Sequence, residues 1–190
     1  MVSSSDQWIN NRYVLHEKLG AGGMGAVYRA TDQLTGNDVA LKRVLLAAPD
    51  ESASDTYDTA TLQIALAREF QVLASLRHPH IISVQDYGFA TDSFVDEVNE
   101  NAFPYFVMPL LNDAQTILQA SYGKTDAEIA HLLIQLLQAM AYLHRRGLLH
   151  RDLKPANVLV VDGQVKVLDF GLSSHRETDH TKGLVGPLAY

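Results

Sequence analysis

The hydrophobic pattern of the chain is mainly strand-like before residues 108–112 and mainly helical after them. Before this point, apolar runs such as YVLHEKLG and DVALKRVLL are separated by glycine turns, which is typical of an antiparallel sheet. After it, Thr125 and Glu128 predict a capping box, and Gly147 predicts the end of the helix that follows. This helix carries a broad apolar stripe: Ile129, Leu132, Leu133, Leu136, Leu137, Met140 and Leu143. We therefore expect an α+β fold with a β-rich part before a helical part.

Other segments predict the rest of the organisation. Residues 1–12 are polar and predict an N-terminal tail, and the acidic segment 48–61 predicts a surface insertion. Residues 62–76 have helical spacing, and His78-Pro79 predicts the end of that helix. Two strands, IISVQDYGF and PYFVMPL, are expected on either side of a long exposed loop.

Composition excludes several classes of protein. A net charge of −7 over 190 residues argues against a nucleic-acid partner held by bulk electrostatics. The absence of cysteine excludes disulfides and thiolate metal sites, and no histidine pair has the spacing of a zinc protease. No apolar run reaches membrane-spanning length and the N-terminus lacks a signal-peptide core, so a cytoplasmic protein is expected. The alternative is a membrane anchor or membrane span after Tyr190, if the natural chain is longer.

The glycine motif GAGGMGAV contains Gly20, Gly22 and Gly25 in the spacing G-x-G-x-x-G. Glycines allow a backbone to approach phosphate oxygens closely. A dinucleotide site needs a helix after this motif, whereas AVYRATD alternates like a strand. No Gly-Lys-Ser/Thr follows, so the motif is not a P-loop. Strand, glycine loop and strand together predict a lid over phosphates.

Lys42 lies in the apolar strand VALKRV, and Glu69 is the only acid in the helix expected over 62–76. Lys42 could be an edge lysine whose charged end reaches water, and Glu69 could lie on a solvated helix face. The functional alternative is that Glu69 directs the Lys42 ammonium towards phosphates.

The stretch HRDLKPANVLV and the later LDFG place polar side chains next to expected strands. Asn157 and Asp169 offer oxygen ligands of the kind that Mg²⁺ prefers. Asp152 could accept a proton from an attacking hydroxyl, and Lys154 could neutralise charge on a transferring phosphoryl group.

Together and in this order, GAGGMGAV, VALK, Glu69 before HPHII, HRDLKPAN and LDFG resemble the signature set of eukaryotic-type protein kinases. The resemblance covers residues 13–190. It implies a bilobal protein-kinase-like fold, with the small lobe over residues 13–111 and part of the large lobe over 112–190. The segments GAGGMGAVYRATD and LDFGLS resemble bacterial, Hanks-type serine/threonine kinases more than animal ones.

The resemblance implies a role for each site residue. Gly20, Gly22 and Gly25 cover ATP, Lys42 binds its phosphates and pairs with Glu69, Asp152 is the catalytic base, and Asn157 and Asp169 bind Mg²⁺. Lys154 is typical of the version specific for serine and threonine. The adenine pocket is formed by Val27, Ala40, Met108, Leu111 and Leu159. Arg151 implies an activation loop ordered by phosphorylation, with Ser173, Ser174, Thr178 and Thr181 as candidate acceptors.

Two features depart from the family pattern. Pro187 stands where the family commonly has threonine, which puts substrate positioning in question. The chain reaches Tyr190 before the family's Ala-Pro-Glu motif and later helices, so a fragment of a longer catalytic domain, poorly soluble or inactive alone, is expected. The leading interpretation is a signalling serine/threonine kinase with protein substrates and possible further signalling domains. The alternatives are a nucleotide-binding pseudokinase or regulatory module and a small-molecule phosphotransferase.

Overall fold

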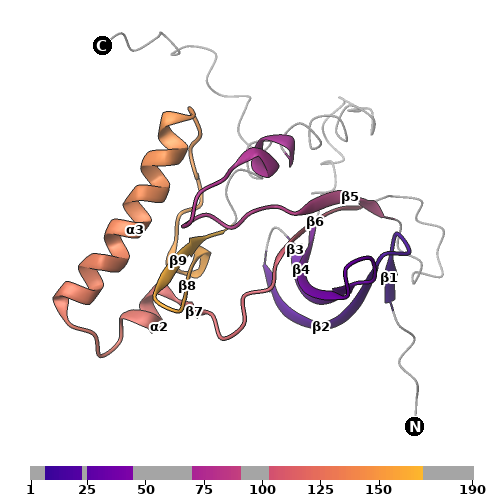
Figure 1. Ribbon diagram of the computed structural model, residues 1–190, viewed down its shortest axis with the longest axis horizontal. Helices are drawn as coiled ribbons and strands as arrows, with labels where there is room; N and C mark the ends of the chain where they lie inside the picture. The colour runs from indigo at the N-terminus through magenta and orange to yellow at the C-terminus, as the bar shows by residue number, and fades with distance from the viewer. Residues whose placement is uncertain (1–6, 23–24, 45–69, 91–102, 169–190) are drawn as a thin grey trace, which may run out of the picture.

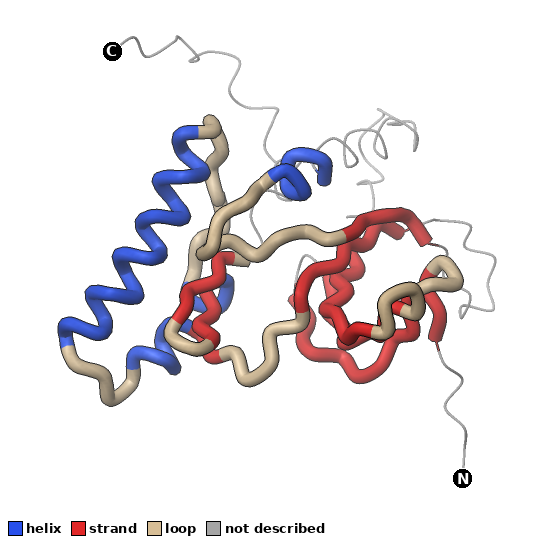
Figure 2. The backbone as a smooth tube through the Cα atoms, in the orientation of Figure 1, coloured by secondary structure: helices blue, strands red, loops and turns tan. Residues whose placement is uncertain are grey.

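The computed structural model describes residues 7–22, 25–44, 70–90 and 103–168, which form two lobes (Figures 1 and 2). The first lobe is a six-stranded antiparallel sheet in the order β1-β2-β3-β4-β6-β5. Its strands are β1 (Gln7–Ile9), β2 (Tyr13–Gly22), β3 (Gly25–Asp32), β4 (Asn37–Val44), β5 (Asp86–Ala90) and β6 (Phe103–Pro109). The second lobe combines a three-stranded sheet with helices: β7 (Gln115–Thr116), α2 (Ile117–Ser121), α3 (Asp126–Arg145), the 3₁₀ helix η1 (Pro155–Asn157), β8 (Val158–Val161) and β9 (Gln164–Val167). The bilobal α+β arrangement, with the β-rich lobe first, is confirmed.

Strand β1 was not expected, and the prediction of a tail over residues 1–12 is wrong for its second half. Ile9 pairs with Tyr13 and is 3% exposed, because it joins a core cluster with residues of β4 and β6. The Asn10 side-chain amide donates to the Phe89 carbonyl and to the Tyr105 hydroxyl, both at 3.0 Å. A polar sequence therefore becomes part of the sheet through contacts that lie far along the chain.

Arg12 binds two carboxylates from different strands. Its guanidinium donates to both oxygens of Asp32 at 2.9 Å and to Asp86 Oδ2 at 2.8 Å. The Tyr13 hydroxyl also donates to Asp86. The Arg12 guanidinium lowers the pKa of the Asp32 carboxyl from an ordinary 3.8 to about 2, although the burial of Asp32 acts in the opposite direction. This network ties the start of β2 to β3 and β5.

The substitution Arg12→Gln is expected to lower the free energy of unfolding, most strongly near neutral pH. A depressed pKa stabilises the fold above the unfolded-state value and loses that effect as the pH falls from about 4 to about 2. The difference in free energy of unfolding between the parent chain and Arg12→Gln should therefore become smaller as the pH falls from about 4 to about 2. Urea unfolding at a series of pH values measures it, and a gap that stays constant down to pH ~2 would contradict the assignment.

Helix α3 begins and ends where the sequence predicts. Thr125 Oγ1 accepts from the Glu128 amide, the Glu128 carboxylate accepts from the Thr125 amide, and Gly147 follows with a φ of 71°. The buried face differs from the expected stripe, since it consists of Leu132, Gln135, Ala139 and Leu143. On the solvent side, exposed fractions are 47% for Leu133, 52% for Ile134 and 65% for Leu137. None of the helices that the structure describes is long and apolar enough to cross a membrane.

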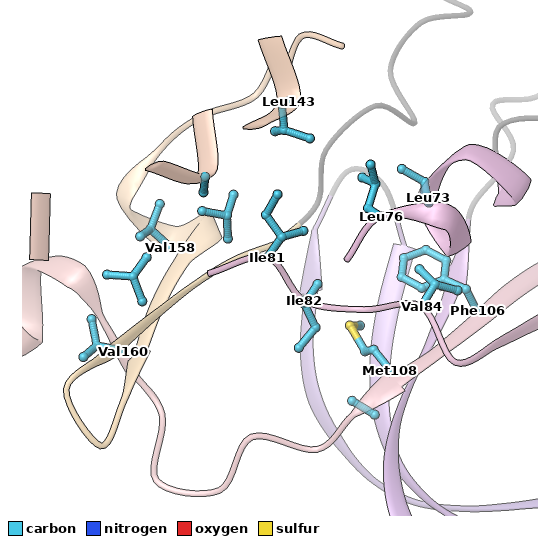
Figure 3. Close-up of a cluster of buried hydrophobic side chains, with 14 of the residues drawn as sticks. Leu73, Leu76, Ile81, Ile82, Val84, Phe106, Met108, Leu143, Val158 and Val160 are labelled. Carbon is cyan, nitrogen blue, oxygen red and sulfur yellow. The ribbon is translucent and has the colours of Figure 1, made fainter. Parts of the chain in front are cut away.

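One cluster of buried apolar side chains extends across both lobes (Figure 3). Met108 and Phe106 from β6 belong to the same cluster as Val158 and Val160 from β8, with Ile81 and Ile82 between them. Residues 70–75 are helical, as predicted for the end of the 62–76 helix. The strand predicted to start at Ile81 begins only at Asp86, because residues 81 and 82 instead bond to β9.

Candidate active site

Asp152, Lys154 and Asn157 form one hydrogen-bonded group. Lys154 Nζ donates to Asp152 Oδ2 at 2.8 Å, and Asn157 Nδ2 donates to the same oxygen at 3.0 Å and to the Asp152 carbonyl at 2.9 Å. The Lys154 ammonium, and after it the Asn157 amide, lower the pKa of the Asp152 carboxyl. At neutral pH the Asp152 side chain is therefore a carboxylate whose Oδ2 is held by two hydrogen bonds.

The local backbone explains why these three side chains meet. Pro155 is the first residue of the 3₁₀ helix η1, where its missing N–H removes no helical hydrogen bond. The backbone N–H of Asn157 donates to the Lys154 carbonyl at 2.9 Å. Arg151, just before Asp152, has a φ of 62°, a conformation in which non-glycine residues are uncommon. This turn reverses the chain sharply enough to bring Asp152 back over η1.

The same loop is fastened to the end of β9. The Leu168 amide donates to the Asn157 carbonyl at 2.8 Å, and Nε2 of the buried His150 lies 2.9 Å from the Leu168 carbonyl. The chain thus passes beside Asn157 one residue before Asp169. Asp169 itself, one of the two predicted metal ligands, lies outside the described residues.

Gln135 is a positioning residue that the sequence analysis missed. It is buried on α3, where its Nε2 donates to the Gly163 carbonyl at 3.0 Å and its Oε1 accepts from the Val165 amide at 2.8 Å. It therefore clamps the β8–β9 turn onto the helix. Its position three residues after Leu132 and four before Ala139 was the available signal, since that spacing places it on one helix face with them.

Lys42 lies in β4, an interior strand of the six-stranded sheet. It is 3% exposed, and its Nζ lies 5.6 Å from the centre of the Phe106 ring. This burial excludes the alternative of an edge lysine whose ammonium reaches water. Its predicted partner Glu69 lies outside the described residues.

The three glycines of the motif have different surroundings. Gly25 has a φ of +132°, and an added Cβ would lie 1.9 Å from the Arg43 carbonyl oxygen. Gly20 and Gly22 have nothing within 4 Å of such a Cβ. The fold itself therefore requires glycine at Gly25, whereas Gly20 and Gly22 leave open space at the tip of the β2–β3 hairpin. The antiparallel pairing of β2 with β3 on either side of the motif confirms the hairpin and excludes a dinucleotide-binding turn, in which a helix would follow.

The residues predicted to enclose the adenine come from both lobes. Ala40 pairs with Met108 across β4 and β6, and both are buried in the shared core with Val27 and Leu111 packed against it. Leu159 is half-buried and does not belong to that core, although its neighbours on β8 do. This alternation directs Leu159 to the opposite face of the β8 strand from the core.

A separate cleft of about 560 Å³ opens behind β6, beside the Arg12 network. Its lining includes Arg12, Asp38, Gln85, Pro109 and Asn112, and none of Lys42, Asp152 or Asn157. Asp38 already pairs with Arg29. The cleft is therefore distinct from the group of polar side chains described above.

Comparisons with known proteins agree with this geometry. A family model described as protein kinase domain matches residues 13–190. A probable serine/threonine-protein kinase of Streptomyces coelicolor is 36% identical over 168 residues, which cover 87% of this chain and 23% of that protein. A cell division control protein 2 homolog of Trypanosoma brucei brucei is 34% identical over 86% of this chain and 47% of its own length. A mitogen-activated protein kinase of Aspergillus niger is 33% identical over 91% and 43%, respectively. The chain spans less than half the length of each of these relatives.

Proposed function

Because the chain belongs to the protein kinase domain family, we propose that it supplies the nucleotide-binding lobe and the catalytic loop of a serine/threonine protein kinase. The reaction is transfer of the terminal phosphoryl group of ATP to a hydroxyl group of a protein. The observation that carries the proposal is the Asp152 carboxylate, held in place by Lys154 and Asn157. Residues 13–111 would form the small lobe, together with β1, and residues 112–190 part of the large lobe.

In this proposal, Asp152 orients the acceptor hydroxyl and takes its proton. The lowered pKa keeps Asp152 a carboxylate at neutral pH, the form that accepts a hydrogen bond from the hydroxyl and so orients it. Lys154 lies within hydrogen-bonding distance of that carboxylate and would neutralise charge on the transferring group. The presence of a lysine at this position supports serine and threonine, rather than tyrosine, as acceptors. A signalling role with protein substrates is the corresponding proposal for the whole protein.

Asn157 and Asp169 would hold Mg²⁺. The donor set fits this ion, because both Asn157 Nδ2 hydrogen bonds go to Asp152 and leave the amide oxygen for a hard cation. When bound, Mg²⁺ supplies positive charge that stabilises the phosphates. The chain's own contribution is to fix the amide through Asp152 and the backbone through Leu168.

The small lobe would bind the nucleotide. Gly20 and Gly22 leave room for the phosphates at the hairpin tip, and Lys42 would contact them, directed by Glu69. Val27, Ala40, Met108, Leu111 and Leu159 would enclose the adenine with branched or small apolar surfaces.

The substitution Lys42→Met is expected to weaken Mg-ATP binding by roughly 10-fold or more, because it removes a charge-assisted contact to phosphate. Methionine preserves most of the buried volume, so the fold should remain. The increase in melting temperature on adding Mg-ATP measures the loss. Lys124→Met, an exposed lysine beside α3, is the matched control.

The function itself is tested by transfer of labelled phosphate from ATP to a generic protein substrate. Transfer to serine or threonine supports the proposal. Mg-ATP binding without any transfer in the full-length protein would favour a nucleotide-binding regulatory module. Transfer only to a small molecule would favour the phosphotransferase alternative.

A further inference from the structure

Four basic residues come from the C-terminal end of α3, from the segment that follows helical residues 70–75 and from β9, whose backbones are drawn in Figure 1. They are Arg77, Arg145, Arg146 and Lys166, which we call the basic cluster. Tyr142 lies at its centre: its hydroxyl accepts from the Arg77 amide at 2.9 Å, and the Arg146 guanidinium lies 4.7 Å from its ring centre. Lys166 Nζ donates to the Pro79 carbonyl at 2.6 Å.

The pKa of His78 responds to the positive charge of the basic cluster. Its ring lies 5.0 Å from the Tyr142 ring and 5.5 Å from that of His80. Burial, and then the neighbouring His80, Arg145 and Lys166, lower the pKa of His78. The charged groups that lower it, among the residues that the structure describes, are all basic. Within the described ranges, no aspartate or glutamate forms an ion pair with any member of the basic cluster.

The negative ends of two helix dipoles offset only part of this positive charge. Two helix C-termini, at residue 75 and at Arg145, point into the cluster, and each is equivalent to about −0.5 charge. Arg77 Nη1 donates to the Ala74 and Leu76 carbonyls at 2.6 and 2.8 Å, which is such a capping contact. Four full positive charges against about one negative charge leave an excess of about three. The excess is local, because the whole chain carries a net charge of −7.

We propose that the basic cluster binds a phosphate monoester, carried by a phosphorylated serine or threonine of a partner protein segment. One arginine guanidinium can bind two phosphate oxygens through two parallel N–H groups, and Arg145 and Arg146 are both exposed at the C-terminal end of α3. A dianion offsets most of the local excess. A single phosphate group fits better than an extended polyanion or a membrane surface, because the acidic remainder of the chain repels both.

A phosphate bound to the basic cluster would affect how the two lobes are held relative to each other. Arg77 belongs to the segment that leads from the small-lobe helix, whereas Arg145 and Lys166 belong to α3 and β9 of the large lobe. One phosphate contacting both sets would hold the lobes together at their junction. This inference rests on the described contacts alone and does not depend on the proposed phosphoryl transfer.

The test is fluorescence anisotropy with the full chain and a labelled peptide containing one phosphoserine, compared with the same peptide containing serine. We expect only the phosphopeptide to bind, and its affinity to fall as salt is raised from about 0.05 M to 0.5 M. The double substitution Arg145→Gln/Arg146→Gln should weaken binding about tenfold or more. Lys124→Gln removes the same kind of charge at the opposite end of the 20-residue α3, about 30 Å away, and should have no effect.

A second measurement separates binding at the basic cluster from binding elsewhere. A phosphate beside His78 should raise the pKa of that imidazole, since a nearby anion favours its protonated form, and this is followed by NMR titration. The proposal is overturned if the double variant binds the phosphopeptide as tightly as the parent chain. It is also overturned if duplex DNA or anionic vesicles bind the parent chain through these arginines more tightly than the phosphopeptide does.

Discussion

Replacement of Asp152 by asparagine is expected to reduce phosphoryl transfer by about 10²–10⁴-fold. Asparagine keeps the size of the side chain and can still accept hydrogen bonds from Lys154 and Asn157. It cannot accept the proton of an attacking hydroxyl at neutral pH, because an amide is not a base in that range. The loss should therefore appear in kcat, while the thermal stabilisation by Mg-ATP persists.

Radiolabelled phosphate transfer under single-turnover conditions measures this effect. Lys154→Gln is the informative comparison, because it removes the ammonium that contributes most to the lowered Asp152 pKa and leaves the carboxylate in place. We expect it to raise that pKa and to shift the acid limb of the pH–rate profile upward. An Asp152→Asn variant with undiminished transfer would show that the proton goes to another group.

Replacement of Gly25 by alanine is expected to cost about 2–4 kcal/mol of folding free energy. A Cβ at this position would collide with the Arg43 carbonyl at 1.9 Å, and the backbone has a φ of +132°. Neither can be relieved by a side-chain rotation, because the neighbour is backbone of the adjacent strand β4. Urea unfolding monitored by circular dichroism measures the change.

Gly20→Ala provides the matched control for Gly25→Ala. It adds the same methyl group to the same hairpin, where nothing lies within 4 Å. Its unfolding free energy should change by less than about 1 kcal/mol, although its affinity for ATP should fall if the phosphates approach this backbone. Equal destabilisation by the two substitutions would refute the distinction between a glycine that the fold needs and one that a ligand needs.

Much of the fold was predictable because its signals are local. The α3 boundaries follow from Thr125, Glu128 and Gly147, whose side chains or backbone act within one helical turn. The strands on either side of the glycine motif follow from alternation over a few residues. Asp152, Lys154 and Asn157 were predicted to act together, and they do meet, since they lie within one tight turn of the chain.

Other features were missed because their partners are distant in sequence. The polar segment around Asn10 is fastened to the sheet partly by hydrogen bonds to Phe89 and Tyr105, which lie far along the chain. Residues 81 and 82 bond to β9 rather than extending β5. The buried face of α3 is centred on Gln135 because the β8–β9 turn needs its amide, a requirement that the helix's own periodicity does not contain.

The sequence by itself determined the family, the order of the elements and the identity of the catalytic-loop residues, since these depend on residue type and short spacing. The tertiary structure alone decided that Lys42 is buried, that Gly25 is required by its neighbouring strand, and that four cations from two lobes share one surface. Burial and electrostatic fields arise from atoms brought together in space. No local pattern of residues specifies them.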